Sequence, residues 1–301
     1  WYVANTLSGM WVFIFIYALL IGYIMYYWYY YANKAKEGGG KLIGIISFAI
    51  LVFAGILMHN FAVTSIMPNE WMNMYAPNGV VDTSGWTFNI NTIRLAFMVS
   101  LSIPVVGIFL QNYSRFLSTR EDFSAQFIKY SADLGTKLTL VGLLLSAILF
   151  VTWMLSIDYL MHPVSLATIV GVLLLLIVAN KNNNSYITTI ILVIVALLIS
   201  GMREVIRFDI MTDLGYNIYD YPVNLEIPTI TMFLLTFLIM GGIGVAYLLT
   251  MAWKVGKTQG VFDGSKDKAV TKLGNYTLTI MVVWMVVYFG WGMTILFKNI
   301  L

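Results

Sequence analysis

The chain has 301 residues, of which 60% are hydrophobic and only 10% are charged. Soluble domains carry about 25% charged residues, so this composition predicts an integral membrane protein and excludes a soluble domain. The sequence contains no cysteine and only two histidines. These counts exclude a disulfide, an iron–sulfur cluster, a c-type haem and a histidine-rich metal cluster within this chain. The expected partner is the lipid bilayer, and no nucleic-acid partner is expected.

Apolar runs in chain order predict about eight transmembrane helices. A helical span needs roughly 20 apolar residues to cross ~30 Å of hydrocarbon. The predicted spans cover residues 10–32, 42–67, 92–112, 136–157, 164–179, 186–201, 228–252 and 274–297. The fifth and sixth are short and are joined by an asparagine-rich turn around Lys181; one broken segment is the alternative there, and totals of seven or nine stay open. The fold class is therefore all-α, a transmembrane helical bundle formed as one domain over residues 1–301.

The distribution of Lys and Arg predicts which side of the membrane each loop faces. Thirteen of the 17 positive residues fall at residues 33–41, 113–137, 180–185 and 253–273. The other four are Arg94, Arg203, Arg207 and Lys298. Because loops rich in Lys and Arg stay in the cytoplasm, both termini are expected on the non-cytoplasmic side, together with the loops at 68–91, 158–163 and 202–227. The expected location is the cytoplasmic membrane of a bacterium or archaeon, with the functional face outward.

Two further stretches carry structural predictions. The segment Arg120–Gly135 alternates apolar and charged residues in a pattern typical of an amphipathic helix lying on the membrane surface. In the seventh predicted span, Gly241-Gly242-Ile243-Gly244 predicts close packing against a neighbouring helix.

Unusual polar residues gather on the predicted outer side. His59 lies about eight residues from the outer end of the second span, hence roughly 12 Å deep at 1.5 Å per residue. Arg94 opens the third span, and His162 lies in the turn before the fifth. A histidine or arginine at membrane depth is costly unless a partner or a ligand uses it, so the chemistry of this chain is expected here.

His59 has two interpretations. A neutral histidine in a helical bundle can be the iron ligand of a haem b, with a methionine or a second histidine opposite. By depth, the candidate partners are Met58, Met98, Met161, Met202 and His162. Arg94 would then pair with a haem propionate or a quinone headgroup. In the alternative, His59 donates a hydrogen bond to a backbone carbonyl of another helix, Arg94 pairs with a loop carboxylate, and His162 is an ordinary turn residue.

The segment Arg203-Glu204-Val205-Ile206-Arg207 follows the sixth predicted span. Arg203 and Arg207 are four residues apart and share one helix face, and the pattern predicts a helix resting in the membrane interface. A quinol headgroup resides at that depth, and its oxidation needs a hydrogen-bond donor and a carboxylate that takes a proton. Arg203 or Arg207 is the candidate donor and Glu204 the candidate acceptor. The alternative is a solvated ion-pair cluster that docks a partner.

At this stretch the sequence resembles a known family. Leu57-Met58-His59-Asn60, Met67-Pro68-Asn69-Glu70-Trp71 and Asn91-Thr92-Ile93-Arg94 resemble subunit I of the cytochrome bd ubiquinol oxidases, and more closely the shorter membrane proteins of that group that accompany respiratory electron-transfer complexes. The resemblance implies at most one haem b, a quinone, and partners such as other subunits of a membrane complex and a periplasmic cytochrome. One departure is Phe97, which stands where the family pattern places a haem-ligating histidine.

Three function classes stay open. The first is a redox subunit that carries electrons between the quinone pool and an outer-face partner. In this class the chain would be a subunit of a quinol-linked oxidoreductase. The second is a cofactor-free structural subunit that anchors a partner. The third is a transporter or channel, against which stands the absence of acids and bases near the midplane of the spans between Thr139 and Ala179.

Overall fold

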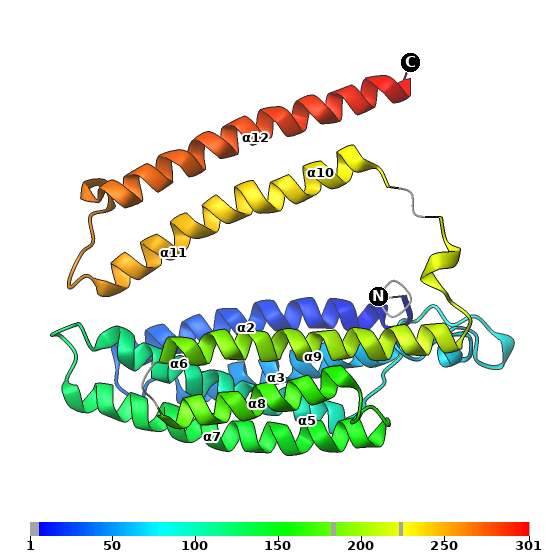
Figure 1. Ribbon diagram of the computed structural model, residues 1–301, viewed down its shortest axis with the longest axis horizontal. Helices are drawn as coiled ribbons and strands as arrows, with labels where there is room; N and C mark the ends of the chain where they lie inside the picture. The colour runs from blue at the N-terminus through cyan, green and yellow to red at the C-terminus, as the bar shows by residue number, and fades with distance from the viewer. Residues whose placement is uncertain (1–5, 182–184, 223–224, 301) are drawn as a thin grey trace. The chain divides into compact units, whose positions relative to one another are not determined.

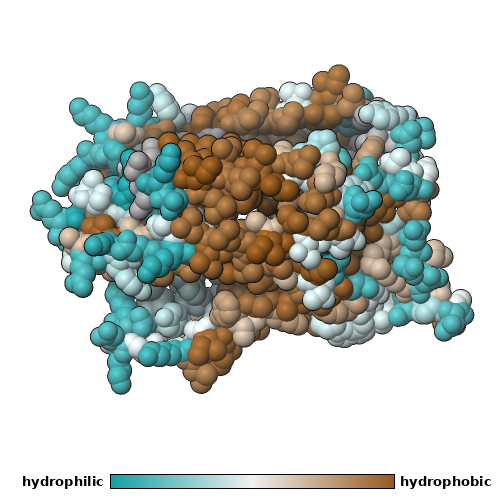
Figure 2. Space-filling model, turned by 60° about the horizontal axis from the view of Figure 1, so that its bottom comes forward, coloured by the Kyte–Doolittle hydropathy of each residue, from teal (hydrophilic) through white to brown (hydrophobic). Residues whose placement is uncertain are grey.

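The computed structural model describes residues 6–181, 185–222 and 225–300. Helix makes up 82% of the structure, and the described residues contain no strand. Eight of the helices in these ranges are long and apolar enough to cross a membrane, which confirms the predicted all-α class and the predicted count (Figure 1). Hydrophobic side chains cover the middle stretches of the helices and hydrophilic side chains lie toward their ends (Figure 2).

Contacts divide the chain into two compact units. Unit 1 comprises Trp1–Phe109 and Leu134–Asn217, and unit 2 comprises Leu110–Asp133 and Ile218–Leu301. The helices that contribute to unit 1 are α2 (Gly9–Ala35), α3 (Lys41–Thr64), α5 (Thr92–Ser100), α6 (Ser102–Leu117), α7 (Ala125–Ser156), α8 (Pro163–Lys181) and α9 (Ser185–Asp213). Between α3 and α5 lie three short helical turns, η1 (Pro68–Glu70), α4 (Trp71–Tyr75) and η2 (Pro77–Gly79).

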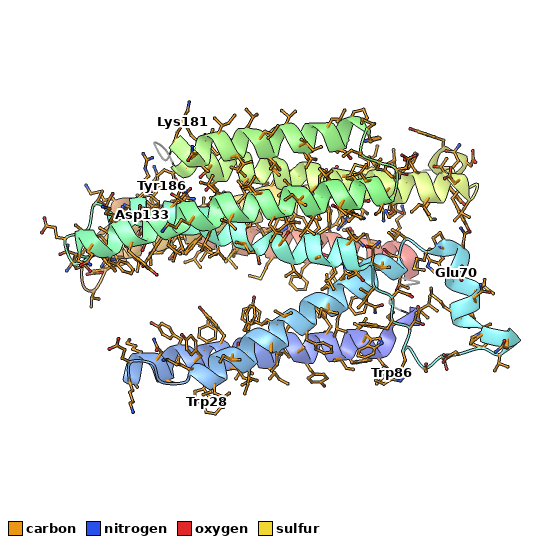
Figure 3. All side chains as sticks on the ribbon, turned by 90° about the horizontal axis from the view of Figure 1, so that it is seen from below. Trp28, Glu70, Trp86, Asp133, Lys181 and Tyr186 are labelled. Atoms are coloured by element: carbon orange, nitrogen blue, oxygen red, sulfur yellow. The ribbon has the colours of Figure 1, made fainter. Side chains whose placement is uncertain are left out.

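Within unit 1, α2 pairs with α3 and α8 pairs with α9. The first pair meets at a glycine: a Cβ on Gly22 would come within 2.7 Å of the Leu51 side chain, and Ser47 Oγ donates to the Gly22 carbonyl at 2.8 Å. Trp28, Lys181 and Tyr186 lie toward one end of the unit, whereas Glu70 and Trp86 lie toward the other (Figure 3). Within unit 1, Lys181 and the end of α2 therefore lie at the same end, as the charge pattern predicts for the loops that begin there.

The third span is two helices, α5 and α6, which meet at Leu101. Pro104 cannot donate the backbone hydrogen bond that would reach Ser100, four residues earlier, so the helix breaks there. The same stretch packs very closely on α7. A Cβ on Gly142 would lie 2.6 Å from Pro104, and a Cβ on Gly107 would lie 2.5 Å from the Thr139 backbone nitrogen. Glycine is therefore required for this approach of α6 to α7.

The predictions of separate surface helices at residues 120–135 and 203–207 are wrong. Residues from Ala125 onward are the first turns of α7, which runs without a break to Ser156. Arg203 and Glu204 lie inside α9, which continues to Asp213 instead of ending near residue 201 and starting a separate interfacial helix. No proline interrupts either stretch, so the backbone hydrogen bonds of the span simply continue. At 29 residues, α9 is about 43 Å long and exceeds the ~30 Å hydrocarbon thickness.

Unit 2 contains the last two spans. The seventh consists of α10 (Ile227–Leu235), a π-helical turn η4 (Thr236–Gly241) and α11 (Gly242–Lys257); the eighth is α12 (Lys268–Ile300). Trp284 Nε1 on α12 donates to Thr236 Oγ1 at 2.9 Å, and Lys254 pairs with Asp267. Within unit 2, no other helix packs at Gly241, Gly242 or Gly244, since a Cβ at any of the three would meet no described atom of that unit within 4 Å.

Candidate functional site

His59 fastens the start of α5. Its side chain is buried, as expected for a ring that faces protein, and Nε2 lies 3.0 Å from the carbonyl oxygen and 3.3 Å from the amide nitrogen of Asn91. Asn91 is the N-cap residue of α5, where its side-chain oxygen accepts from the Arg94 amide at 2.9 Å. Nε2 is therefore engaged by the backbone of Asn91, which is the kind of contact that the structural interpretation of His59 predicts.

Asn60, the next residue along α3, is the centre of a buried polar network. Its Oδ1 accepts from the Asn89 amide at 2.6 Å, and its Nδ2 lies 3.4 Å from both Ser8 Oγ and the Thr87 carbonyl oxygen. Asn89 Nδ2 in turn donates to Thr64 Oγ1 at 3.1 Å. The sequence reasoning assigned no role to these residues. The signal that could have found them is the pair of small polar residues at positions 60 and 64, which share one helix face.

Aromatic residues attach the same loop to α2. Trp11 Nε1 donates to the Trp86 carbonyl oxygen at 3.1 Å, and the two indole rings meet edge to face at 5.0 Å. Gly85 has φ +70, and a Cβ there would lie 2.9 Å from the Gly9 and Met10 amide nitrogens, so only glycine fits this close approach. The loop before α5 is thus held at the ends of both α2 and α3.

Arg94 is buried on the first turn of α5 with 4% exposure. Its guanidinium carbon lies 5.6 Å from the centroid of the Trp153 ring. The predicted loop carboxylate is not there: among the described residues, neither Nε nor Nη1 has a hydrogen-bond partner. Each unpaired buried donor costs about 1–3 kcal/mol, whereas a desolvated cation–π contact returns about 2 kcal/mol. The guanidinium is therefore buried without a full set of hydrogen-bond partners among the described residues.

The methionines proposed as ligands do not face His59. Met58 is 41% exposed, because consecutive residues on a helix point in different directions. Met161 is exposed on the outer turn. Met202 is buried, and its sulfur accepts from Ser165 Oγ at 3.1 Å. Met98 lines the cavity described next, which His59 does not line.

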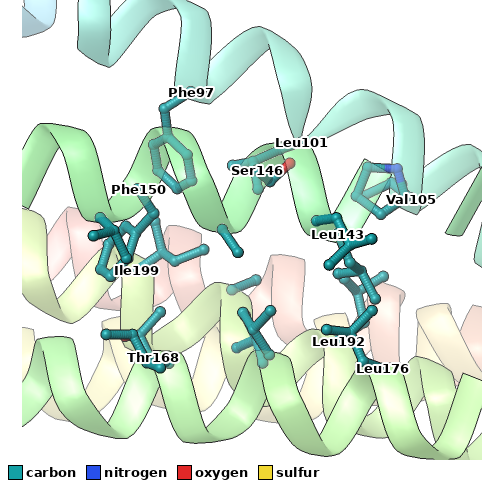
Figure 4. A pocket seen from close by; sticks show the side chains of 18 of the residues that line it. Phe97, Leu101, Val105, Leu143, Ser146, Phe150, Thr168, Leu176, Leu192 and Ile199 are labelled. Atoms are coloured by element: carbon teal, nitrogen blue, oxygen red, sulfur yellow. The ribbon is translucent and has the colours of Figure 1, made fainter. Parts of the chain in front are cut away.

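An apolar cavity of about 410 Å³ lies between the helices of unit 1 (Figure 4). Its walls come from α5, α6, α7, α8 and α9, and they include Phe97, Leu101, Leu143, Phe150, Val172, Leu192 and Ile199. The polar lining residues are Ser146, Thr168, Ser200 and Arg203. Ser200 and Arg203 are the last lining residues along α9, so the cavity is apolar over most of its length and has an arginine at the end nearest the turn between α7 and α8.

The segment that carries Arg203 forms a chain of ion pairs. Glu204 Oε1 accepts from Arg203 at 2.7 Å, and Glu204 Oε2 accepts from Arg207 at 2.6 Å, all three side chains being about half exposed. Both carboxylate oxygens are therefore occupied by guanidinium groups, which is unfavourable for the predicted role of Glu204 as proton acceptor. Of these three predicted residues, only Arg203 lines the cavity.

The turn between α7 and α8 supplies a group that the sequence reasoning missed. Tyr159 Oη donates to Asp209 Oδ2 at 3.0 Å. Burial, together with this hydrogen bond to the carboxylate, raises the pKa of Tyr159 to about 12. In the same turn His162 Nδ1 accepts from the Val164 amide at 3.2 Å. His162 therefore caps α8, which is the role of an ordinary turn residue.

A haem b does not fit the residues that the sequence put forward for it. Haem b needs a histidine and usually a second ligand on the opposite face, whereas the cavity has no histidine in its lining. Phe97, at the position of the family's ligand, packs instead against Phe150 and Trp153, with ring centroids 5.4 and 5.7 Å away. The described residues also hold no group of three or more potential metal ligands.

The structure thus brings Phe97, Met98 and Arg203 together around one cavity. It leaves His59 and Asn60 in a hydrogen-bonded network at the end of α3. The likeness to the cytochrome bd group is carried by the quoted residues alone, and the function has to be argued from this geometry. No protein-family model, curated protein or solved structure matches the chain.

Proposed function

We propose that this chain is the membrane subunit of a respiratory electron-transfer complex and that it binds an isoprenoid quinone in the cavity of unit 1. The observation that carries the proposal is the cavity itself, apolar along its walls with Arg203 at one end. An isoprenoid quinone has the matching chemistry, a long apolar tail and a flat headgroup with carbonyl oxygens that accept hydrogen bonds. Ligand sites commonly combine apolar walls with a few convergent polar groups.

The residues at the outer end provide binding and a proton route. Arg203 donates to the headgroup, and the hydrogen-bonded pair of Tyr159 and Asp209 lies beyond it, with Asp209 about 9 Å farther along α9. A proton released from a quinol would leave through such a hydrogen-bonded carboxylate. The electrons would pass to another subunit, of which an outer-face cytochrome is the expected kind. The residues of this chain bind and orient the quinone.

The proposed setting is the cytoplasmic membrane of a bacterium or archaeon, with both termini and the cavity's Arg203 end outside. The charge pattern supports this orientation. The chain has no cysteine, so single replacements can be labelled with an impermeant maleimide in intact cells. Asn78→Cys should react and Lys268→Cys should not, and the reverse result would overturn the orientation.

Quinone binding is tested by filling the cavity. Val172 lines it, whereas Val170, on the same helix α8, is exposed and does not. Val172→Phe should lose the quinone that co-purifies with the wild-type chain, and it should no longer bind an added decyl-substituted benzoquinone. Val170→Phe makes the same side-chain change outside the cavity and should behave as wild type. Equal quinone content in the two variants, or no binding by the wild type, would contradict the proposal.

A second candidate, a cofactor-free structural subunit, is favoured by the hydrogen bonds of His59 and Asn60. Through these bonds His59 and Asn60 hold the loop before α5 in place. A surface that docks a partner needs such a fixed loop. In that case Asn60→Leu should release a partner subunit during purification, and Val172→Phe should leave the assembly and its electron transfer unchanged.

A further inference from the structure

Arg94 is the one buried cation of unit 1 that the proposed function leaves unexplained among the described residues. It is 96% buried, and two of its guanidinium nitrogens have no hydrogen-bond partner in the described part of the chain. Other polar side chains buried at this end of the unit, namely those of Asn60, Thr64 and His59, have hydrogen-bond partners. Arg94 therefore has N–H donors that are free to bind a ligand.

The position of Arg94 relates it to the cavity. It lies three and four residues before Phe97 and Met98 on α5, so the three residues share one face of that helix. Phe97 and Met98 line the cavity, as Arg203 does from α9. Arg94 and Arg203 are close enough for their positive charges to repel each other. Arg94 itself does not line the cavity; it lies one helical turn before Phe97 on α5, toward the end of the cavity that Arg203 lines.

Arg94 and Arg203 differ in whether a carboxylate balances their positive charge. Arg203 shares a carboxylate with Arg207 through Glu204. Arg94 has no ion pair within the described residues, and Trp153 lies over its guanidinium. The face of an aromatic ring offsets part of a positive charge, but it does not accept the directed N–H bonds that a planar guanidinium offers to oxygen. A charge in this state attracts an anion.

We infer that Arg94 binds an oxygen of the quinone headgroup and that the site prefers headgroups in which this oxygen is negatively charged. This inference rests on the proposed function. It narrows the ligand class to quinones that can present an ionised oxygen, such as hydroxynaphthoquinones or the deprotonated quinol. The guanidinium supplies N–H donors and a positive charge together, and such charge-assisted hydrogen bonds are about twice as strong as neutral ones.

The preference of Arg94 for a negatively charged oxygen is tested by comparing two probes that differ in charge. An alkylated hydroxynaphthoquinone is ionised at neutral pH, and its methyl ether is neutral but has almost the same shape. Both are titrated into the purified full-length chain, and binding is followed by quenching of tryptophan fluorescence. Wild type should bind the ionised probe at least about tenfold more tightly than the ether. Arg94→Met should abolish this preference while ether binding stays close to wild type, and Arg94→Lys should retain most of it.

Two further variants keep the outcome clear. Arg94→Gln keeps a neutral donor and covers the case in which Arg94→Met does not fold; it should bind the ether and lose the preference. Arg207→Met removes an arginine that is ion-paired and does not line the cavity, and it should keep the preference. An undiminished preference in Arg94→Met and Arg94→Gln would overturn the inference and leave quinone binding intact. If wild type bound neither probe, the proposed function would be overturned together with the inference.

Discussion

The helices α5–α7 and the helices α10–α12 are about equally apolar, yet they are packed very differently. Within unit 1, five helices line one cavity and pack core side chains such as Phe97, Phe150 and Met202, whereas within unit 2 the last two spans meet at contacts such as that of Trp284 with Thr236. Apolar character is thus sufficient to make a helix suitable for the bilayer, but it does not determine what the helix packs against, since lipid is as apolar as leucine.

Glycine positions show the origin of the difference. Gly107 and Gly142 lie where α6 and α7 almost touch, and a methyl group at either position would collide with the other helix. Within unit 2, no described atom comes within 4 Å of a Cβ on Gly242 or Gly244 in α11. The same residue type therefore permits close packing in unit 1 and has no such role in unit 2. The following predictions test this contrast, from the largest effect to the smallest.

Gly107→Leu should cause the largest loss of stability. The added side chain would meet Thr139 backbone atoms on α7, which cannot move away without shifting the helix, so the cost is at least about 3 kcal/mol. Thermal unfolding in detergent measures it. Gly244→Leu is the matched control in α11 and should change the melting temperature little. A similar loss in both variants would show that α11 is packed as closely as α6.

Asn60→Leu should destabilise the chain by about 2–3 kcal/mol, because it leaves the Asn89 amide and its neighbours buried without a partner. The loop at residues 80–91 should become sensitive to protease before the helices do. Asn73→Leu, an exposed asparagine bonded only to Glu70, should leave the digestion pattern unchanged. Equal protection of the loop in both variants would contradict the role of Asn60.

His59→Ala should cost about 1–2 kcal/mol, since the Asn91 backbone at the start of α5 loses its buried partner. The same protein should show no haem absorbance after reduction with dithionite, before or after the substitution. A Soret band in wild type that His59→Ala removes would reinstate His59 as an iron ligand and refute the structural role derived from its hydrogen bonds.

Tyr159→Phe should have the smallest effect, about 0.5–1.5 kcal/mol for one hydrogen bond to Asp209. The contribution of this hydrogen bond to the free energy of unfolding should also depend on pH. The pKa of Tyr159 is raised from 10.0 to about 12 in the folded chain, so its contribution is complete below pH 10 and is lost as the pH rises through about 12. The stability difference between wild type and Tyr159→Phe should therefore shrink over that range. A constant difference would show that the hydroxyl does not titrate as proposed.

The sequence alone predicted the properties that depend on summed local chemistry. Membrane character, the all-α class and eight spans follow from the apolar runs, because each run must satisfy its own backbone hydrogen bonds in a helix. The ends of the spans were less predictable. Both α7 and α9 extend through charged residues such as Lys129 and Arg203, since a charge changes hydropathy without interrupting helical hydrogen bonding.

The candidate site was decided by the tertiary structure. The sequence indicated that His59 and Arg94 are unusual, but it could not choose between a ligand and a backbone partner for His59. That partner, Asn91, is 32 residues away in the chain, and the cavity is lined from five helices. Periodicity and hydropathy describe a segment by itself, whereas a hydrogen bond or a cavity depends on atoms of several segments meeting within a few ångströms. Only the folded chain brings Asn91 to His59 and leaves Arg94 buried without a carboxylate.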